Sequence, residues 1–151
     1  MIRAYTGEDQ EKLSLLLRLN TPLYFHPAEE QDFIYYLENH AQNYFVVEHA
    51  NTIIGCGGIN YFDGGKTARI SWDINILGHH APECAGKRVW PYTNQYRIDQ
   101  IKSNPTVERI VVRTTQMVYR FYQKSGFELI KTEKDFWAED FDLYQMELKI
   151  K

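Results

Sequence analysis

The amino-acid sequence predicts an α/β (α+β) protein with one mixed, mostly antiparallel sheet. Segments of strand type between Tyr44 and Leu77 are separated by turn-forming residues, a pattern typical of an antiparallel meander. A helical segment, Arg88–Ser103, then leads to a β-branched run at Val107–Arg113. Because such crossovers are almost always right-handed, the last strand of the meander and Val107–Arg113 are expected to lie parallel. The full order predicts a seven-stranded sheet flanked by about four helices.

The N-terminal part is predicted to form one strand and two helices. Met1–Tyr5 is the strand, and Thr6 with Asp9 three residues later matches a capping box that begins the first helix. Pro27 stands where the second helix would begin, since a proline in a first turn loses no hydrogen bond. Both helices repeat apolar residues at helical spacing, which gives each a buried stripe. These residues are Leu13, Leu16 and Leu17 in the first helix, and Phe33, Ile34, Tyr36 and Leu37 in the second.

Three strands are predicted for the middle of the chain, at Tyr44–Val47, Thr52–Tyr61 and Thr67–Leu77. The residues Asp63-Gly64-Gly65-Lys66 indicate a tight hairpin between the second and the third. Apolar and polar residues alternate along the third strand, which predicts that they lie on opposite faces of the sheet. Ile70, Trp72, Ile74 and Ile76 are expected on one face, and Arg69, Ser71, Asp73 and Asn75 on the other.

The C-terminal part is predicted to add a buried strand, a short helix and two final strands. Thr114 or Thr115 can cap the short helix, and Gly126 is suited to end it as the glycine that follows the C-cap. The final strands are expected at Glu128–Phe136 and Phe141–Ile150.

Composition limits the function classes. The 151 residues fit a single domain, 1–151, with one core. The net charge of -3 and the lack of a Lys/Arg-rich run argue against a nucleic-acid partner. No apolar run approaches membrane-spanning length, and the N-terminus lacks the apolar segment of a signal peptide. Cys56 and Cys84 have no metal or redox spacing, so a cytoplasmic protein with reduced thiols is expected.

The segment Val107–Phe127 carries the most specific signal in the sequence. It is a predicted strand and helix, and its last seven residues, Phe121–Phe127, read FYQKSGF. This ending resembles the FYEKxGF motif of the GNAT acetyltransferase superfamily, with Gln123 in place of the usual glutamate. The order of elements along essentially the whole chain is also similar to that family. The resemblance implies a GNAT-like sheet that splays between its fourth and fifth strands.

A second segment resembles the loop with which that family holds the pyrophosphate of acyl-CoA. Pro82–Trp90 lies between a predicted strand and the long helix, whose N-terminus attracts phosphate. Ala85 stands where the family has Gln or Arg, while Arg88 and Trp90 stand where it has glycine or another small residue. The cofactor-binding residues that the resemblance implies here are Ala85, Gly86, Lys87, Arg88, Val89 and Trp90.

The resemblance implies that acetyl-CoA is the co-substrate and that its acetyl group passes directly to a primary amine. Tyr122 matches the family's frequent catalytic tyrosine and would protonate the leaving thiolate. Asp73 is the candidate base for the amine, with Glu48 or a chain of waters as alternatives. A backbone N–H near Ile76 would donate to the oxyanion. The remaining implied contacts with the cofactor are the backbone of Ile74, Asn75, Ile76 and Leu77, together with Thr115.

The acceptor site is expected between the first helix–helix connection and the last two strands. Its candidate lining residues are Thr21, Tyr24, Phe25, Phe136 and Trp137, although packing in the core or in a lid is an alternative use of each side chain. These rings do not distinguish a small-molecule amine from a peptide amine, and the sequence is also compatible with a homodimer. The pair His79-His80 lacks a matching ligand cluster, so no metal site is predicted.

Three interpretations of the function follow, one of which is a dimeric structural or interaction protein that uses exposed aromatic C-terminal strands. In the first, the chain is an N-acetyltransferase that uses acetyl-CoA. In the second, it is a binding or regulatory module of the same fold whose altered loop, with Arg88 and Trp90, has lost efficient CoA binding. The first predicts stabilisation of the protein by acetyl-CoA, and the second predicts none.

Overall fold

A computed structural model describes the backbone of residues 1–76 and 89–151, and the side chains of these residues except 89–92. Its strands form one sheet in the order β1-β2-β3-β4-β5-β7-β6. Neighbouring strands are antiparallel except β4 and β5, which are parallel as predicted. The strands are β1 (Ile2–Ala4), β2 (Tyr44–His49), β3 (Thr52–Phe62), β4 (Thr67–Asn75), β5 (Arg109–Thr114), β6 (Glu128–Ala138) and β7 (Phe141–Lys149).

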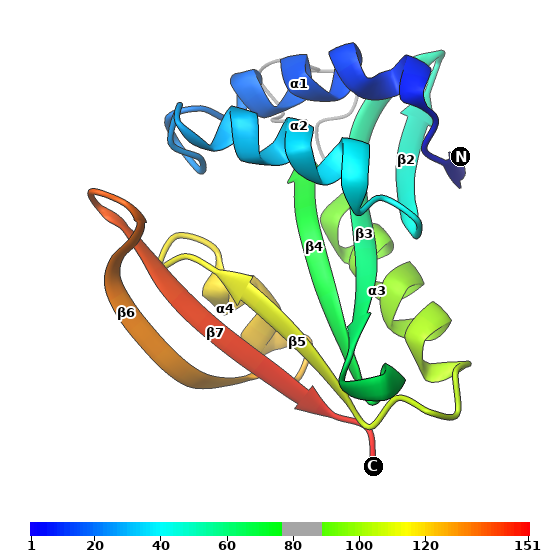
Figure 1. Cartoon of the computed structure of the whole chain (residues 1–151), viewed down its shortest axis with the longest axis vertical. Helices are drawn as coiled ribbons and strands as arrows, with labels where there is room; N and C mark the ends of the chain where they lie inside the picture. Colours follow the sequence, from blue (N-terminus) through cyan, green and yellow to red (C-terminus); the bar gives the residue numbers. More distant parts are fainter. Residues whose placement is uncertain (77–88) are drawn as a thin grey trace.

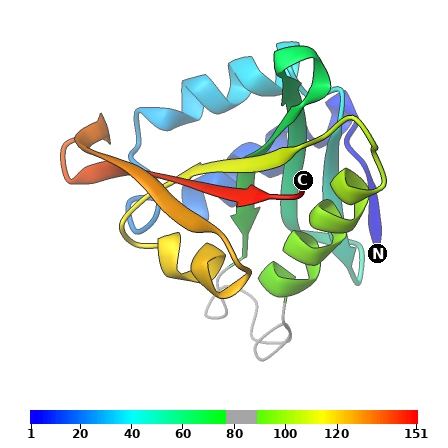
Figure 2. The same ribbon diagram turned by 90° about the horizontal axis from the view of Figure 1, so that it is seen from below.

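Helices cover both faces of the sheet. Figure 2 shows α1 and α2 on one face and α3 and α4 on the other. The helices are α1 (Gln10–Leu19), α2 (Glu29–Asn39), α3 (Val89–Lys102) and α4 (Tyr119–Lys124), with short 3-10 turns at Gly7–Asp9 and Asp63–Gly65. Among the described residues, no helix combines the length and the apolar character needed to cross a bilayer.

The sheet is open between β4 and β5. The parallel ladder joins only Thr67–Ile70 to Arg109–Val112. Beyond these pairs β4 continues to Asn75 and β5 continues to Thr114, and the two strands diverge (Figure 1). This divergence is the splay that the sequence resemblance implied, and it leaves the facing edges of both strands without a neighbouring strand.

Each face of the sheet has its own apolar core. The α1/α2 face buries Leu13, Leu16, Leu17, Phe33, Tyr36, Leu37, Val46, Cys56 and Ile74. The α3/α4 face buries Ile59, Ile70, Ile98, Ile101, Val107, Ile110, Val112, Phe127 and Met146. The predicted stripes of α1 and α2 are therefore confirmed, apart from Ile34, which is only half-buried.

The prediction that Ile70, Trp72 and Ile74 share one face of β4 is wrong. Ile70 packs in the α3/α4 core, whereas Ile74 and Trp72 pack in the α1/α2 core. The register between β3 and β4 shifts between Cys56 and Gly58, opposite Trp72, whose φ of 45° lies in the left-handed region. A β-bulge of this kind inserts one residue and reverses the alternation of faces beyond it.

Helix ends follow the sequence signals at two of four predicted sites. Pro27 does not lie in the first turn of α2, because the helix begins at Glu29 after the N-cap Ala28. Thr6 and Asp9 form the capping box, although the first turn that follows is 3-10. Gly126 follows the end of α4 with a φ of 97°, as predicted. The prediction that Thr114 or Thr115 caps α4 is wrong, because the chain first makes a turn and the helix then begins after Val118 without a side-chain cap.

Candidate functional site

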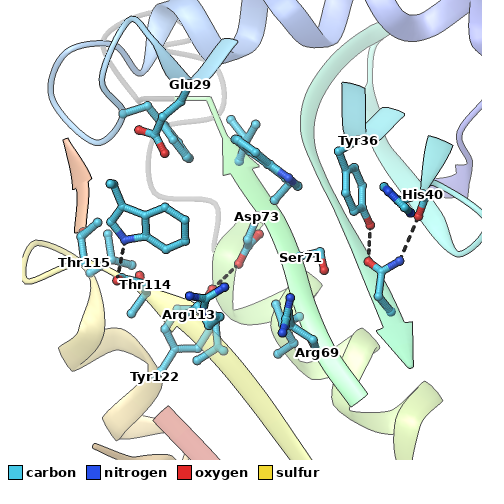
Figure 3. A pocket seen from close by; sticks show the side chains of 18 of the residues that line it. Glu29, Tyr36, His40, Arg69, Ser71, Asp73, Arg113, Thr114, Thr115 and Tyr122 are labelled. Carbon is cyan, nitrogen blue, oxygen red and sulfur yellow. Dashed lines mark hydrogen bonds between the residues drawn. The ribbon is translucent and has the colours of Figure 1, made fainter. Parts of the chain in front are cut away.

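A cavity of about 680 Å³ opens where β4 and β5 separate. Its walls come from α2 and the segment before it, from β3, β4 and β5, and from α4 and the end of β6 (Figure 3). Its lining residues include Tyr24, Phe25, Glu29, Arg69, Asp73, Asn75, Arg113, Thr115, Tyr122 and Trp137. The splayed strands therefore supply the two long sides of one pocket.

Asp73 and Tyr122, the two predicted catalytic residues, meet in this cavity. The Tyr122 hydroxyl donates a hydrogen bond of 2.9 Å to Asp73 Oδ2. The same oxygen lies 2.6 Å from Nη2 of Arg97 on α3, so one carboxylate oxygen joins a tyrosine to a cation. Asp73 Oδ1 accepts a longer bond of 3.3 Å from Asn75 Nδ2. Residues from β4, α3 and α4 thus converge on a single carboxylate.

The bulge at Trp72 explains why Asp73 reaches this position. It turns Asp73 towards α3 and α4, whereas Ser71 on the other side of the bulge faces the cavity wall formed by Tyr36. The strained Trp72 backbone is held by its surroundings. The Tyr44 hydroxyl donates to the Trp72 carbonyl at 2.7 Å, and the Trp72 ring lies 4.9 Å from that of Phe33. Such strain is commonly found at functional sites.

Tyr122 is fixed by the end of α4. The Phe127 N–H donates to the Tyr122 carbonyl and the Gly126 N–H donates to the Gln123 carbonyl, the two bonds of a Schellman motif. The side chain is 3% exposed, and burial raises the pKa of the Tyr122 hydroxyl well above its usual value. The Asp73 charge raises that pKa further, while Arg97 acts in the opposite direction.

Arg97 is a site residue that the sequence analysis missed. Its side chain is fully buried, and its guanidinium group lies next to Gly57 on β3. A Cβ at position 57 would come within 2.7 Å of Arg97 Nη1, so the glycine leaves the room that this side chain fills. The helical spacing of Arg97 with Ile98 and Ile101 was visible in the sequence, but the burial of Arg97 and of the polar residues Thr93 and Asn94 beside it was not.

The residues expected to contact CoA fall into three groups. Ile74, Asn75 and Thr115 line the cavity, and the Thr115 hydroxyl is buried without a hydrogen-bond partner among the described residues. Val89 and Trp90 begin α3, and only their backbone is described. Leu77, Ala85, Gly86, Lys87 and Arg88, together with His79, His80 and Cys84, lie outside the described residues.

The backbone N–H groups near Ile76 point to opposite edges of β4. The Ile76 N–H donates to the Ile54 carbonyl on β3 at 2.8 Å, so this group is bonded to the sheet. Because successive N–H groups of an extended chain point to opposite edges, the N–H of Asn75 points towards the open edge that faces β5. Asn75 is therefore the better candidate for the predicted backbone donor.

Of the predicted acceptor residues, Tyr24, Phe25 and Trp137 line the cavity, whereas Thr21 and Phe136 are not among its lining residues. The Trp137 indole N–H donates to the Thr114 carbonyl at 3.3 Å, which ties the end of β6 to the end of β5. Glu48 is not among the lining residues, and it is paired with Arg3 at 2.7 Å. Glu48 is therefore not placed beside Asp73 and Tyr122 in this cavity.

Glu29 is a second site residue that the sequence analysis did not identify. It lines the cavity from the start of α2, and its Oε2 accepts the His26 N–H at 2.7 Å. Burial raises the pKa of the Glu29 carboxyl. A carboxylate with a raised pKa is a stronger base near neutral pH. Within the described residues, no group of three or more His, Cys, Asp or Glu side chains could hold a metal ion.

Solved structures match the chain over its full length. No family model and no curated protein matches the sequence. An aminoglycoside 6'-N-acetyltransferase complexed with coenzyme A aligns with a TM-score of 0.75 at 14% identity, covering 100% of this chain and 97% of that chain. A GNAT-family acetyltransferase from Streptococcus pneumoniae aligns with a TM-score of 0.73 at 13% identity, covering 100% and 99%. This chain has the GNAT fold.

A third structure with the GNAT fold comes from an enzyme that acts on a protein. The ribosomal-protein-alanine N-acetyltransferase from Brucella melitensis aligns with a TM-score of 0.73 at 15% identity, covering 99% of both chains. The fold predicted from the order of elements and from Phe121–Phe127 is thus confirmed, while the similar structures differ in the acceptors that their names give.

Proposed function

We propose that this protein is an acetyl-CoA-dependent N-acetyltransferase that transfers the acetyl group to a primary amine by direct attack. The observation that carries the proposal is the position of Tyr122 and Asp73 on a cavity formed by the splay of β4 and β5. The similar aminoglycoside 6'-N-acetyltransferase, which was solved with coenzyme A, supports the same donor.

The open edges of β4 and β5 fit a pantetheine arm. Its amide groups need partners, and beyond Ile70 and Val112 the facing strand edges have backbone groups that no neighbouring strand pairs, although the Asn75 carbonyl accepts from Asn20 and the Thr114 carbonyl from Trp137. The Thr115 hydroxyl and the side-chain Oδ1 of Asn75 are buried without partners among the described residues, so each can bond to a polar group of a ligand. Acetyl-CoA would supply a thioester carbonyl for attack, near the Asn75 N–H.

Tyr122 is the proposed proton donor to the leaving sulfur. Its hydroxyl has one proton, which it shares with Asp73, so donation to sulfur requires that it turn away from the carboxylate. Asp73 then keeps its contact with Arg97 and is not left uncompensated. Arg97 also lowers the pKa of Tyr122 against the effect of burial. We therefore assign Asp73 to positioning Tyr122, in place of the role as base predicted from the sequence.

The acceptor must lose a proton, because an alkyl amine has a pKa of about 10.4 and is charged near neutral pH. Glu29 is the proposed base, acting directly or through water from the wall opposite Tyr122. After Glu29 has taken the first proton from the ammonium group, the C–N bond forms and the C–S bond breaks. The nitrogen then loses its second proton to water, while Tyr122 gives its proton to the sulfur and is reprotonated from water, so that one proton is released overall. The products are the N-acetylated amine and free CoA thiol.

Binding and turnover can be tested separately. If the proposal is correct, acetyl-CoA at about 100 times its dissociation constant will stabilise the protein by about 2.7 kcal/mol, seen as a rise in Tm. Free thiol will then appear only when an amine acceptor is added. An unchanged Tm at millimolar acetyl-CoA, with no thiol released by any amine, would instead favour the binding or regulatory module.

A further inference from the structure

Two arginines line the cavity from the strands that separate, Arg69 on β4 and Arg113 on β5 (Figure 3). The Arg69 guanidinium carbon lies 4.3 Å from the centre of the Phe62 ring. That of Arg113 lies 4.9 Å from the ring of Phe136 and 5.5 Å from that of Trp137. Aromatic faces hold both cations without using their N–H donors in hydrogen bonds.

Neither arginine has a counter-ion in the described parts of the chain. No described carboxylate lies within ion-pair distance of Arg69 or Arg113. The Arg69 Nε is buried and has no hydrogen-bond partner there. Burial lowers the pKa of Arg69, and the nearby charge of Arg113 lowers it further. Two neighbouring cations that are partly desolvated are unfavourable together, and a bound anion would relieve both effects.

The carboxylates of the cavity do not balance this charge. Asp73 already pairs with Arg97, and Glu29 is bonded to the backbone N–H of His26. Arg97 is fully buried outside the lining and neutralises Asp73, so the two lining arginines are opposed by one remaining carboxylate, that of Glu29. A polycationic amine would therefore meet excess positive charge, whereas a ligand with a negative group would be attracted.

We propose that the acceptor is a compact amine that also carries a carboxylate or a phosphate. The anionic group binds Arg69 and Arg113, and the amine points towards Asp73 and Tyr122. Guanidinium forks suit both anions, because they can donate paired hydrogen bonds to two oxygens. Arg69 and Asp73 are four residues apart on β4, at most about 13 Å along the strand, so a short molecule spans the two ends. This inference rests on the proposed acetyltransferase function.

Matched amines test the anionic group directly. The acceptors are β-alanine against propylamine and phosphoethanolamine against ethanolamine, with spermidine as the polycation, and the measurement is thiol release from acetyl-CoA. We expect kcat/KM to be about tenfold or more higher for an anionic member of a pair, since charge-assisted hydrogen bonds to arginine are strong. Whichever of β-alanine and phosphoethanolamine has the higher kcat/KM shows whether the site prefers a carboxylate or a phosphate. A preference for the neutral amines or for spermidine overturns the inference and leaves the acetyltransferase proposal intact.

Variants of the two arginines test whether these residues cause the preference for anionic amines. Arg69→Gln and Arg113→Gln should each remove most of the preference, while the rise in Tm with acetyl-CoA is unchanged. Arg109→Gln is the matched control, because Arg109 lies on the same strand as Arg113 but outside the cavity, beside Asp63. Retention of the full preference in both cavity variants would overturn the assignment.

A binding measurement separates this inference from the function on which it rests. β-Alanine and phosphoethanolamine are each added without acetyl-CoA, and the Tm of the wild type is compared with that of the Arg69→Gln, Arg113→Gln double variant. Stabilisation of the wild type alone supports the anion site even if no amine is acetylated, in which case only the acetyltransferase proposal fails. If neither amine is acetylated and neither stabilises the wild type more than its neutral partner, the inference fails.

Discussion

Arg97 gives the sharpest test of how the site is built. Its side chain is fully buried, that of Asp73 is 8% exposed, and their closest atoms are 2.6 Å apart. At an effective dielectric constant of about 20, charges at this separation attract by about 6 kcal/mol before desolvation is counted. Removing one partner of a buried pair usually costs about 3–5 kcal/mol, because the remaining charge has no compensation. Arg97→Met should lower the free energy of unfolding by this amount.

Substituting Asp73 as well distinguishes the loss of the ion pair from the loss of packing around Arg97. Asp73→Asn removes the carboxylate that Arg97→Met leaves buried, so the double variant should regain about half or more of the lost stability. The assay is urea unfolding of the wild type, both single variants and the double variant, followed by tryptophan fluorescence. Additive losses in the double variant would refute the reasoning, because they would show that the two residues do not act on one another.

Three further predictions concern catalysis, packing and pH. Tyr122→Phe should lower kcat about a hundredfold with little change in KM for acetyl-CoA, because the proton donor is lost. An unchanged kcat in steady-state kinetics would remove Tyr122 from the mechanism. Gly57→Ala should cost about 1–3 kcal/mol in urea unfolding, because its Cβ would lie 2.7 Å from Arg97 Nη1. Gly7→Ala, where a Cβ meets nothing within 4 Å, is the control, and equal losses would contradict the steric argument. Hydrogen bonds from Arg3 lower the pKa of the Asp9 carboxyl from 3.8 to about 2. The ionised Asp9 therefore contributes about 2 kcal/mol to the free energy of unfolding. This contribution is complete above about pH 4 and is lost as the pH falls through about 2. Asp9→Asn should flatten the unfolding profile in this range, and equal slopes for both proteins would show that the pair contributes nothing.

Much of the fold could be predicted because local signals agree with the tertiary structure. The apolar spacing in α1 and α2, the hairpin at Asp63–Lys66 and the glycine after α4 each depend on a few neighbouring residues. The crossover rule then fixed the parallel pair of β4 and β5 without any knowledge of contacts. The ends of strands were less predictable, because β4 and β5 each continue past the last residue pair of the ladder that joins them.

The site was harder to predict because its parts meet only in the folded chain. Tyr122 was identified through a motif, and Asp73 through its place on a polar strand face. Arg97 lies in α3 among apolar residues, and nothing local shows that it pairs with a carboxylate on β4. Glu29 has a local role at the start of α2, and this conceals its position on the cavity wall. Long-range electrostatic partners of this kind require the sheet topology before they can be proposed.

The bulge at Trp72 determines where the candidate site residues of β4 lie. A regular β4 would put Arg69, Ser71 and Asp73 on one face, and the carboxylate could not then meet Arg97 and Tyr122 on the other side of the sheet. With the bulge, one strand directs Arg69 into the cavity and Asp73 towards α3 and α4. The left-handed backbone of Trp72 is unfavourable for a bulky residue, and the ring packing against Phe33 and the bond from Tyr44 offset it. The aromatic core on the α1/α2 face is therefore a structural requirement of the site, and not only of the fold.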